Sequence, residues 1–461
     1  MTVLTSINDR PNSRFCGATL VVLCCSLISL IWYFAPNPVV ALVLCALPLG
    51  ILFVLNHIFW LVIFFVLFSF FRIHEVIPAL YPLKIPLLLS AGALVALAWH
   101  SLVSRRLTPY WHPSLSWLAA FWILILIGIA LASSRPIAIE YFKNIYWKIM
   151  VMTLAIVWIV NREKYLSYIT LLINASGFLV GCTALYNSIN GIGLVEGTRV
   201  TIGRDIGSML GDPNDLALVL MFPLAFSIST FIVKQNRLLL RFFGLLTSAI
   251  LVFSIVATQS RGGLLGTLAI FSVLVLFRIR SKALLVSLGI AVALFLYFVA
   301  DISQRASGGA AEVGVDASAM GRLYAWQAAY RMAIENPLTG VGLNNFYSNY
   351  FYYSSHWDGL NHAVHSTWFG VLAETGILGL IVFISFIVSL IRTARKTVNN
   401  LKNQTCTASV NTMANAVYAG LIGTAVSGTF LTQGFNWPIY ILAALTICVA
   451  QIACQNENLK K

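Results

Sequence analysis

The sequence predicts an all-α polytopic transmembrane helical bundle of about 12–14 spans. Of its 461 residues 59% are hydrophobic and only 10% are charged, whereas soluble domains carry about 25% charged residues. Apolar stretches of roughly 20 residues, the length that crosses the hydrocarbon core, recur from Gly17 to Cys454 with short polar interruptions. Lipid is therefore the solvent for most of this chain.

The apolar stretches set the expected order of helices. In the first half we expect spans at 17–35, 37–52, 55–71, 85–103, 114–133, 145–160 and 165–188, and in the second half at 213–233, 239–258, 262–278, 283–300, 366–391, 412–432 and 436–454. The first apolar run continues directly into further spans, so we interpret it as a helix and not as a cleaved signal peptide. The run from Pro38 to Phe71 contains no acid, lysine or arginine and fits either two short helices or one span with a re-entrant piece.

The net charge of +14 is explained by topology. If the N-terminus is cytoplasmic and the spans alternate, the cytoplasmic loops hold eighteen of the 29 Lys and Arg residues but only three acids, Asp9, Glu163 and Glu457. This is the bias of the positive-inside rule, and it places both termini in the cytoplasm. These basic residues are Arg10, Arg14, Arg105, Arg106, Arg162, Lys164, Lys234, Arg237, Arg241, Arg278, Arg280, Lys282, Arg392, Arg395, Lys396, Lys402, Lys460 and Lys461. Attraction to anionic membrane lipid adds to the excess, and no motif supports nucleic-acid binding.

Three regions follow from this topology. Residues 1–300 are expected to form transmembrane helices with an external loop near 187–212, residues 301–365 a long external loop, and residues 366–461 the C-terminal transmembrane helices. The long loop begins with a flexible linker at 307–310. It then predicts a surface helix at 320–335, since Leu323, Trp326, Tyr330 and Ala333 recur at helical spacing. The cysteines fall almost entirely in or beside apolar spans, which indicates buried side chains and not a disulfide framework.

The external loops gather arginines and histidines. They are Arg199, Arg204, Arg261, Arg305, Arg322, Arg331, His356, His362 and His365. Guanidinium groups bind phosphate bidentately, and histidine serves as a base near neutral pH. The set therefore predicts a base beside an anion clamp.

Each member also has a plainer interpretation. Arg261 could extend from its helix end to the surface, and Arg204 could form a solvated pair with Asp205. His362 and His365 are three residues apart, but no third ligand stands at a recognised spacing, so we expect no metal. The aromatic run that includes Tyr347 is either an interfacial belt or a platform for sugar rings. Glu374 lies inside an apolar run, where a carboxylate is a functional candidate by default.

Four segments resemble the bacterial O-antigen ligase and polymerase superfamily. His365, Ser366, Gly376 and Gly379 fit the ligase pattern of a histidine, a small polar residue and two spaced glycines. The stretch Arg204 to Ala217 is similar to its arginine, glycine and Pro-Asn segment, and Ser260, Arg261 and Gly262 to its Ser-Arg-Gly helix start. The fourth segment resembles the family's long-loop helix and turn, and its matching residues are Gly321, Arg322, Trp326, Pro337, Gly340, Gly342 and Phe346.

The resemblance implies a GT-C-like membrane glycosyltransferase of the bacterial inner membrane with a periplasmic active face. It implies a glycan donor linked to undecaprenyl diphosphate and a lipid A core acceptor. His365 would be the base, with Arg261 and Arg204 as catalytic partners on the diphosphate. Substrate contacts would come from Arg322, Arg199, His362, Tyr347, Trp326 and Glu374. No cofactor or metal is expected, and direct displacement would invert the anomeric carbon.

Other functions share these features. O-antigen polymerases and protein O-oligosaccharyltransferases use the same donor with another acceptor. A small-anion transporter, for an ion such as bicarbonate, would also use arginines facing a cavity, but its binding groups should lie near the midplane, whereas these lie at one surface. A non-enzymatic scaffold has no distinct signal.

Overall fold

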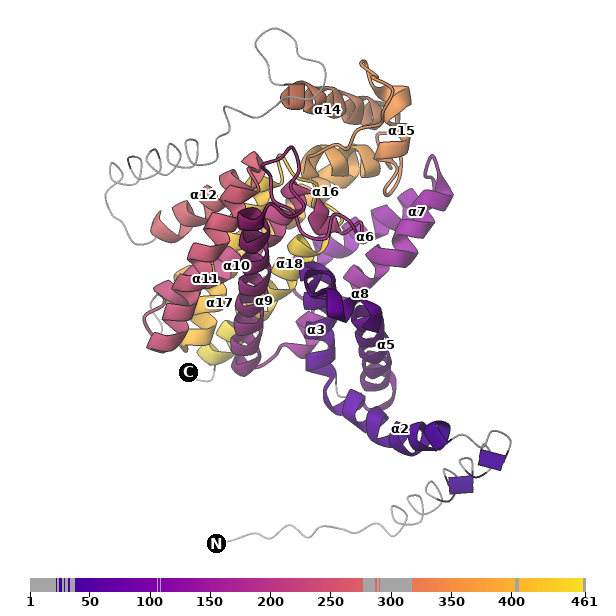
Figure 1. Cartoon of the computed structure of the whole chain (residues 1–461), viewed down its shortest axis with the longest axis vertical. Helices are drawn as coiled ribbons and strands as arrows, with labels where there is room; N and C mark the ends of the chain where they lie inside the picture. The colour runs from indigo at the N-terminus through magenta and orange to yellow at the C-terminus, as the bar shows by residue number, and fades with distance from the viewer. Residues whose placement is uncertain are drawn as a thin grey trace.

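The computed structural model of the chain is a bundle of helices with a smaller helical layer across one end (Figure 1). The structure describes residues 38–105, 107, 109–276, 317–402 and 406–458, together with isolated positions at 22, 25, 26, 29, 32, 33, 287 and 290. Secondary structure in these ranges is helical apart from turns and one isolated bridge between Val195 and Arg199.

The elements follow one another in this order. The first half contains α2 (Pro38–Asn56), α3 (Ile58–Phe71), α4 (Ile73–Val76), η1 (Pro78–Leu83), α5 (Ile85–Ala98), η2 (Trp99–Val103), α6 (Pro113–Ala130), α7 (Arg135–Tyr141), η3 (Phe142–Tyr146), α8 (Trp147–Ile159) and α9 (Glu163–Asn190). The second half contains η4 (Met209–Gly211), α10 (Pro213–Ile232), α11 (Leu238–Ala257), α12 (Arg261–Leu276), α14 (Ala317–Glu335), α15 (Phe346–Tyr353), α16 (Thr367–Leu401), α17 (Ala408–Ser427) and α18 (Trp437–Asn458).

The predicted fold class is confirmed. Within the described residues, eight helices are long and apolar enough to cross a membrane, or nine if a bent pair counts as one span. Most of the expected span 17–35, all but two positions of the expected span 283–300, and the linker with Arg305 lie outside the described residues. α17 is not among the eight, yet it packs against α10, α12 and α18. Its neighbours are protein, so a less apolar sequence suffices there.

The uncharged run before Phe71 forms a bent pair of helices. α2 and α3 meet at His57 with a bend of 81°. The left-handed backbone of Arg72, with φ of 53°, then ends α3 and begins α4. The run expected to form either two short helices or one span with a re-entrant piece is thus a sharply bent pair of helices, and Arg72 lies at the turn that follows it.

The span expected at 145–160 begins earlier, at Arg135. Charged residues from Arg135 to Lys148 interrupt the apolar pattern, so the sequence pattern marked only its second half. The helix continues through them because the π-helical turn η3 joins α7 to α8 without a break. Lys148 consequently lies inside a candidate span, Arg135–Ile159.

The predicted surface helix is present as α14, which crosses the end of the bundle above α16 (Figure 1). We call this end the α14 end. The buried face of α14 consists of Ala325, Ala328, Ala329, Met332 and Ala333, while Leu323 and Tyr330 are exposed. The alanines allow close packing on the protein, so the larger apolar side chains are left to face the surroundings.

A kink in α16 receives the turn after α14. Gly376 has φ of 72° within the helix, and Ile377 N–H donates to the Pro337 carbonyl at 2.8 Å while Val341 N–H donates to the Ala373 carbonyl at 2.8 Å. A Cβ on Gly376 would lie 2.5 Å from the Pro337 carbonyl oxygen. Only glycine fits both this conformation and this approach.

Candidate functional site

His365 stands at the junction of the loop after α15 with α16. Its backbone is left-handed, with φ of 44°, a strained conformation for a residue with a side chain. The chain before and after it is fixed, because the Val364 carbonyl accepts a hydrogen bond from Trp326 Nε1 at 3.1 Å and Thr367 N–H, two residues after His365, donates to the Gly428 carbonyl at 2.7 Å. The surrounding structure thus holds His365 in place.

Charged groups surround the His365 imidazole. Burial lowers the pKa of His365, and the positive charge of Arg322 lowers it further. Asp212 raises this pKa, whereas His362 and Arg199 lower it. A pKa below the usual 6.5 favours the neutral imidazole near pH 7, the form that can accept a proton.

Arg261 and Arg322 line one cavity at the α14 end. Its volume is about 310 Å³, and its remaining walls are Leu265, Leu323, Trp326 and Phe430. The Arg322 guanidinium lies 6.0 Å from the centre of the Phe430 ring, and Trp326 stacks on Phe369 with ring centres 5.0 Å apart. The cavity presents two guanidinium groups on an otherwise apolar wall, which suits an anionic head with an apolar tail.

The start of α12 positions Arg261. Gln259 is left-handed, with φ of 51°, and the Ser260 hydroxyl accepts from Gly263 N–H at 3.3 Å and donates to Asn214 Oδ1 at 3.0 Å. A Cβ on Gly263 would approach Ala217 to 2.7 Å. The Ser-Arg-Gly-Gly sequence therefore packs α12 closely against α10 and brings Arg261 to its first turn.

Arg199 is tied into the protein. It is buried, and its Nε donates to the Thr258 carbonyl at 3.1 Å while Nη2 donates to Asn214 Oδ1 at 3.2 Å. These bonds fix the loop to the ends of α10 and α11, although the charge still acts on His365. Arg204 is exposed on the same loop and, in the part of the chain described, is not among the charges that act on His365.

His362 forms an exposed pair beside the site. Its Nε2 lies 3.0 Å from both carboxylate oxygens of Asp358, and this hydrogen bond lowers the pKa of Asp358. The His362 ring packs edge to face against the Tyr350 ring, with ring centres 5.4 Å apart. Tyr347, which lies on α15 with Tyr350, is exposed. Among the described residues, no three His, Cys, Asp or Glu side chains gather where they could hold a metal ion.

Glu374 is buried in α16 and bonds to backbone groups. Its Oε2 accepts from Asn344 N–H at 2.7 Å, and its Oε1 accepts from Phe346 N–H at 3.4 Å. These N–H groups precede and open α15, where a carboxylate is favoured by the helix dipole. Glu374 therefore fixes α15 on α16.

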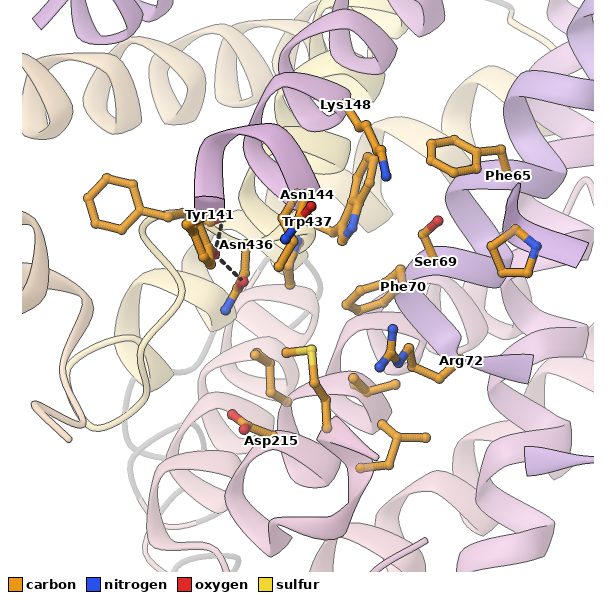
Figure 2. Close-up of a pocket in the computed structure, with 18 of the residues that line it drawn as sticks. Phe65, Ser69, Phe70, Arg72, Tyr141, Asn144, Lys148, Asp215, Asn436 and Trp437 are labelled. Carbon is orange, nitrogen blue, oxygen red and sulfur yellow. Dashed lines mark hydrogen bonds between the residues drawn. The ribbon is translucent and has the colours of Figure 1, made fainter. Parts of the chain in front are cut away.

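A second, larger cavity was not predicted from the sequence. It has a volume of about 540 Å³ and lies between α3, α5, α8, α10 and the start of α18. Figure 2 shows its labelled residues Phe65, Ser69, Phe70, Arg72, Tyr141, Asn144, Lys148, Asp215, Asn436 and Trp437. Glu374, His74 and Asn344 also line it. The one sign of this cavity in the sequence was Lys148, because a charged residue within an apolar span is a candidate for function.

Comparison with known proteins bears on the family and not on the geometry of the site. Residues 246–384 match a family model described as O-antigen ligase, which confirms the resemblance. The matched segment contains Arg261, Arg322 and His365, and it supports a ligase- or polymerase-type function in a multi-pass membrane protein. No curated protein matches the chain.

Proposed function

We propose, from the premise that residues 246–384 carry the O-antigen ligase family's domain, that the protein transfers a glycan from undecaprenyl diphosphate to a sugar hydroxyl of lipid A core. The observation that carries this proposal is the joint placement of Arg261 and Arg322 in one cavity with Arg322 acting on a neutral His365. The enzyme then works at the periplasmic face of a bacterial inner membrane, with both termini cytoplasmic.

The 310 Å³ cavity receives the donor diphosphate. Arg261 and Arg322 contribute two fixed positive charges, and Trp326, Leu323 and Leu265 contribute apolar wall beside them. The diphosphate leaves with a growing negative charge, so preorganised guanidinium groups stabilise the transition state more than the ground state. Arg204 supplies a further cation from the neighbouring loop.

His365 removes the acceptor proton. The hydroxyl oxygen attacks the anomeric carbon as its proton passes to the imidazole, and the bond from that carbon to the diphosphate oxygen breaks. Undecaprenyl diphosphate departs with the bonding electrons, and one displacement inverts the anomeric configuration. No cofactor or metal ion enters these steps.

The other predicted residues take supporting roles. Trp326 and Tyr347 offer ring faces to sugars, and the exposed His362 pair with Asp358 is proposed to contact the glycan. Arg199 contributes its charge to His365 while holding its own loop. Glu374 acts by fixing α15, the helix that carries Tyr347.

The same geometry would serve a polymerase or a protein O-oligosaccharyltransferase, which differ only in the acceptor. A small-anion transporter is favoured less, since the paired arginines lie at the α14 end of the bundle and not midway along it.

The test is glycan transfer with purified protein. Wild type and His365→Ala are each given undecaprenyl-diphosphate glycan and lipid A core, and the acceptor is analysed by mass. We expect the acceptor to gain the glycan mass with wild type and not with the variant. Equal transfer by both would contradict the assignment of the base, and no transfer by wild type would contradict the proposed acceptor.

A further inference from the structure

We propose that the 540 Å³ cavity is the acceptor site and that it recognises a phosphate-bearing saccharide anchored in lipid, through Lys148. This inference rests on the proposed function and assigns the second substrate to a place separate from the 310 Å³ cavity.

The cavity contains a lysine that its surroundings do not neutralise. Lys148 lies in the candidate span Arg135–Ile159 and lines the cavity, and in Figure 2 its ammonium points into the open space. Within the described residues, no carboxylate lies within ion-pairing distance of it. An ammonium at membrane depth is costly unless it serves a ligand or ion, so an anionic group of the ligand is its natural partner.

The other charged groups of the cavity are already engaged or suit a sugar. Arg72 reaches in from another side (Figure 2) but is held by Glu75 through contacts of 2.9 and 3.0 Å. Glu374 is bonded to the backbone of α15. Asp215 and Asn144 remain on the walls as groups that bind hydroxyls, whereas Asn436 already accepts a hydrogen bond from the Tyr141 hydroxyl at 3.4 Å.

The remaining wall is apolar and aromatic. Phe65, Phe70 and Trp437 line the cavity together with Leu87 and Leu218. Aromatic faces stack on sugar rings, and the aliphatic side chains suit a lipid anchor. One lysine, several hydroxyl-binding groups and an apolar wall together describe a phosphorylated glycolipid head.

The two cavities meet at the segment that supports His365. Phe430 lines the smaller cavity, whereas Thr432 and Asn436 line the larger one. Between them, the Leu431 carbonyl accepts from the Thr367 hydroxyl at 2.7 Å, and the same hydroxyl accepts from Gln433 N–H at 2.9 Å. Thr367 follows His365 by two residues. The same short segment therefore contributes walls to both cavities and holds Thr367, so we propose that donor and acceptor meet near it.

The inference is tested by measuring the affinity of the purified full-length protein in detergent for lipid A core. The probes are lipid A core, the same core after enzymatic dephosphorylation, phosphatidylglycerol and undecaprenyl diphosphate. Loss of one charge-assisted hydrogen bond should weaken binding of lipid A core in Lys148→Gln by about tenfold or more, while undecaprenyl diphosphate binds unchanged. Lys148→Arg should restore most of the affinity, and Lys143→Gln, which changes an exposed lysine of the preceding turns, should bind like wild type.

The outcomes separate this inference from the proposed function. If lipid A core binds in a Lys148-dependent manner but no glycan is transferred, the cavity assignment stands and the transfer proposal fails. If glycan is transferred but Lys148→Gln leaves the affinity for lipid A core unchanged, the cavity assignment is overturned. Lys148-dependent binding of phosphatidylglycerol with equal affinity would overturn the saccharide part, and lost binding of undecaprenyl diphosphate in Lys148→Gln would overturn the acceptor assignment.

Discussion

The carboxylate of Glu374 accepts the backbone N–H of Asn344 at 2.7 Å. This bond joins the first half of α16 to the turn that opens α15. His365 lies just before α16 and Glu374 lies inside it. The bond from Glu374 therefore also fixes α15, with its aromatic residues, relative to the proposed base His365.

Glu374→Ala is expected to destabilise the protein. The change leaves the N–H groups of Asn344 and Phe346 without their acceptor, at a cost of about 1.5–3 kcal/mol in the free energy of unfolding. The midpoint of thermal unfolding in detergent should fall, and protease cleavage near α15 should increase. Glu140→Gln, at an exposed carboxylate, is the control. An unchanged unfolding midpoint in Glu374→Ala would show that the bond has no structural role.

Arg261→Ala is expected to abolish transfer while the protein remains inserted and folded. Loss of one preorganised charge at a departing anion costs about 10²–10³ in kcat. The measurement is kcat for glycan transfer, with the thermal unfolding midpoint as the check on folding. Arg237→Ala, an exposed arginine before α11, should transfer at the wild-type rate. Wild-type kcat in Arg261→Ala would disprove the diphosphate clamp.

The rate should depend on the protonation of His365. Its pKa is lowered from the usual 6.5, so the neutral base is lost only as pH falls through a midpoint below 6.5, and kcat/KM should be level near pH 7. Arg322→Gln removes a charge that lowers this pKa, so the acid midpoint should move to higher pH. Arg331→Gln, on the same helix but exposed, should leave the midpoint unchanged. A shift to lower pH in Arg322→Gln would contradict the coupling.

Gly376→Ala should disturb the docking of α14. Alanine at φ of 72° is strained, and its Cβ would meet the Pro337 carbonyl at 2.5 Å. We expect at least about 1 kcal/mol of destabilisation, measured as a lower thermal unfolding midpoint. Gly321→Ala is the matched control, because a Cβ there meets nothing within 4 Å and alanine favours helix. Equal midpoints in the two variants would count against the role of the kink.

Transfer should continue in the presence of a chelator. The proposed displacement uses Arg261, Arg322 and His365 and no metal ion. The rate of the purified protein is compared before and after dialysis against EDTA, with added Mg²⁺ as the control. Loss of transfer that Mg²⁺ restores would overturn the metal-free mechanism.

Much of this protein follows from local sequence. The length of the apolar stretches sets the helices, because a backbone in lipid must satisfy its own hydrogen bonds. Most of the described spans start and end close to the expected positions, but one begins at Arg135 instead of 145 and α16 ends at Leu401 instead of 391. The helix at 320–335 was predicted from residues that recur at helical spacing, and the Ser-Arg-Gly start of α12 from the family resemblance. In the structure, the predicted site residues Arg261, Arg322 and Trp326 line one cavity, and their roles stay a prediction.

Tertiary structure decided what no local pattern carries. The sequence could not show that Glu374 bonds to the backbone of Asn344, that Arg199 is tied to Thr258, or that the span with Lys148 begins at Arg135. It also could not show the 540 Å³ cavity, whose walls come from residues between Phe65 and Pro438. Hydropathy and spacing report on one helix at a time, whereas a cavity and the partners of a buried charge depend on how separate helices pack together.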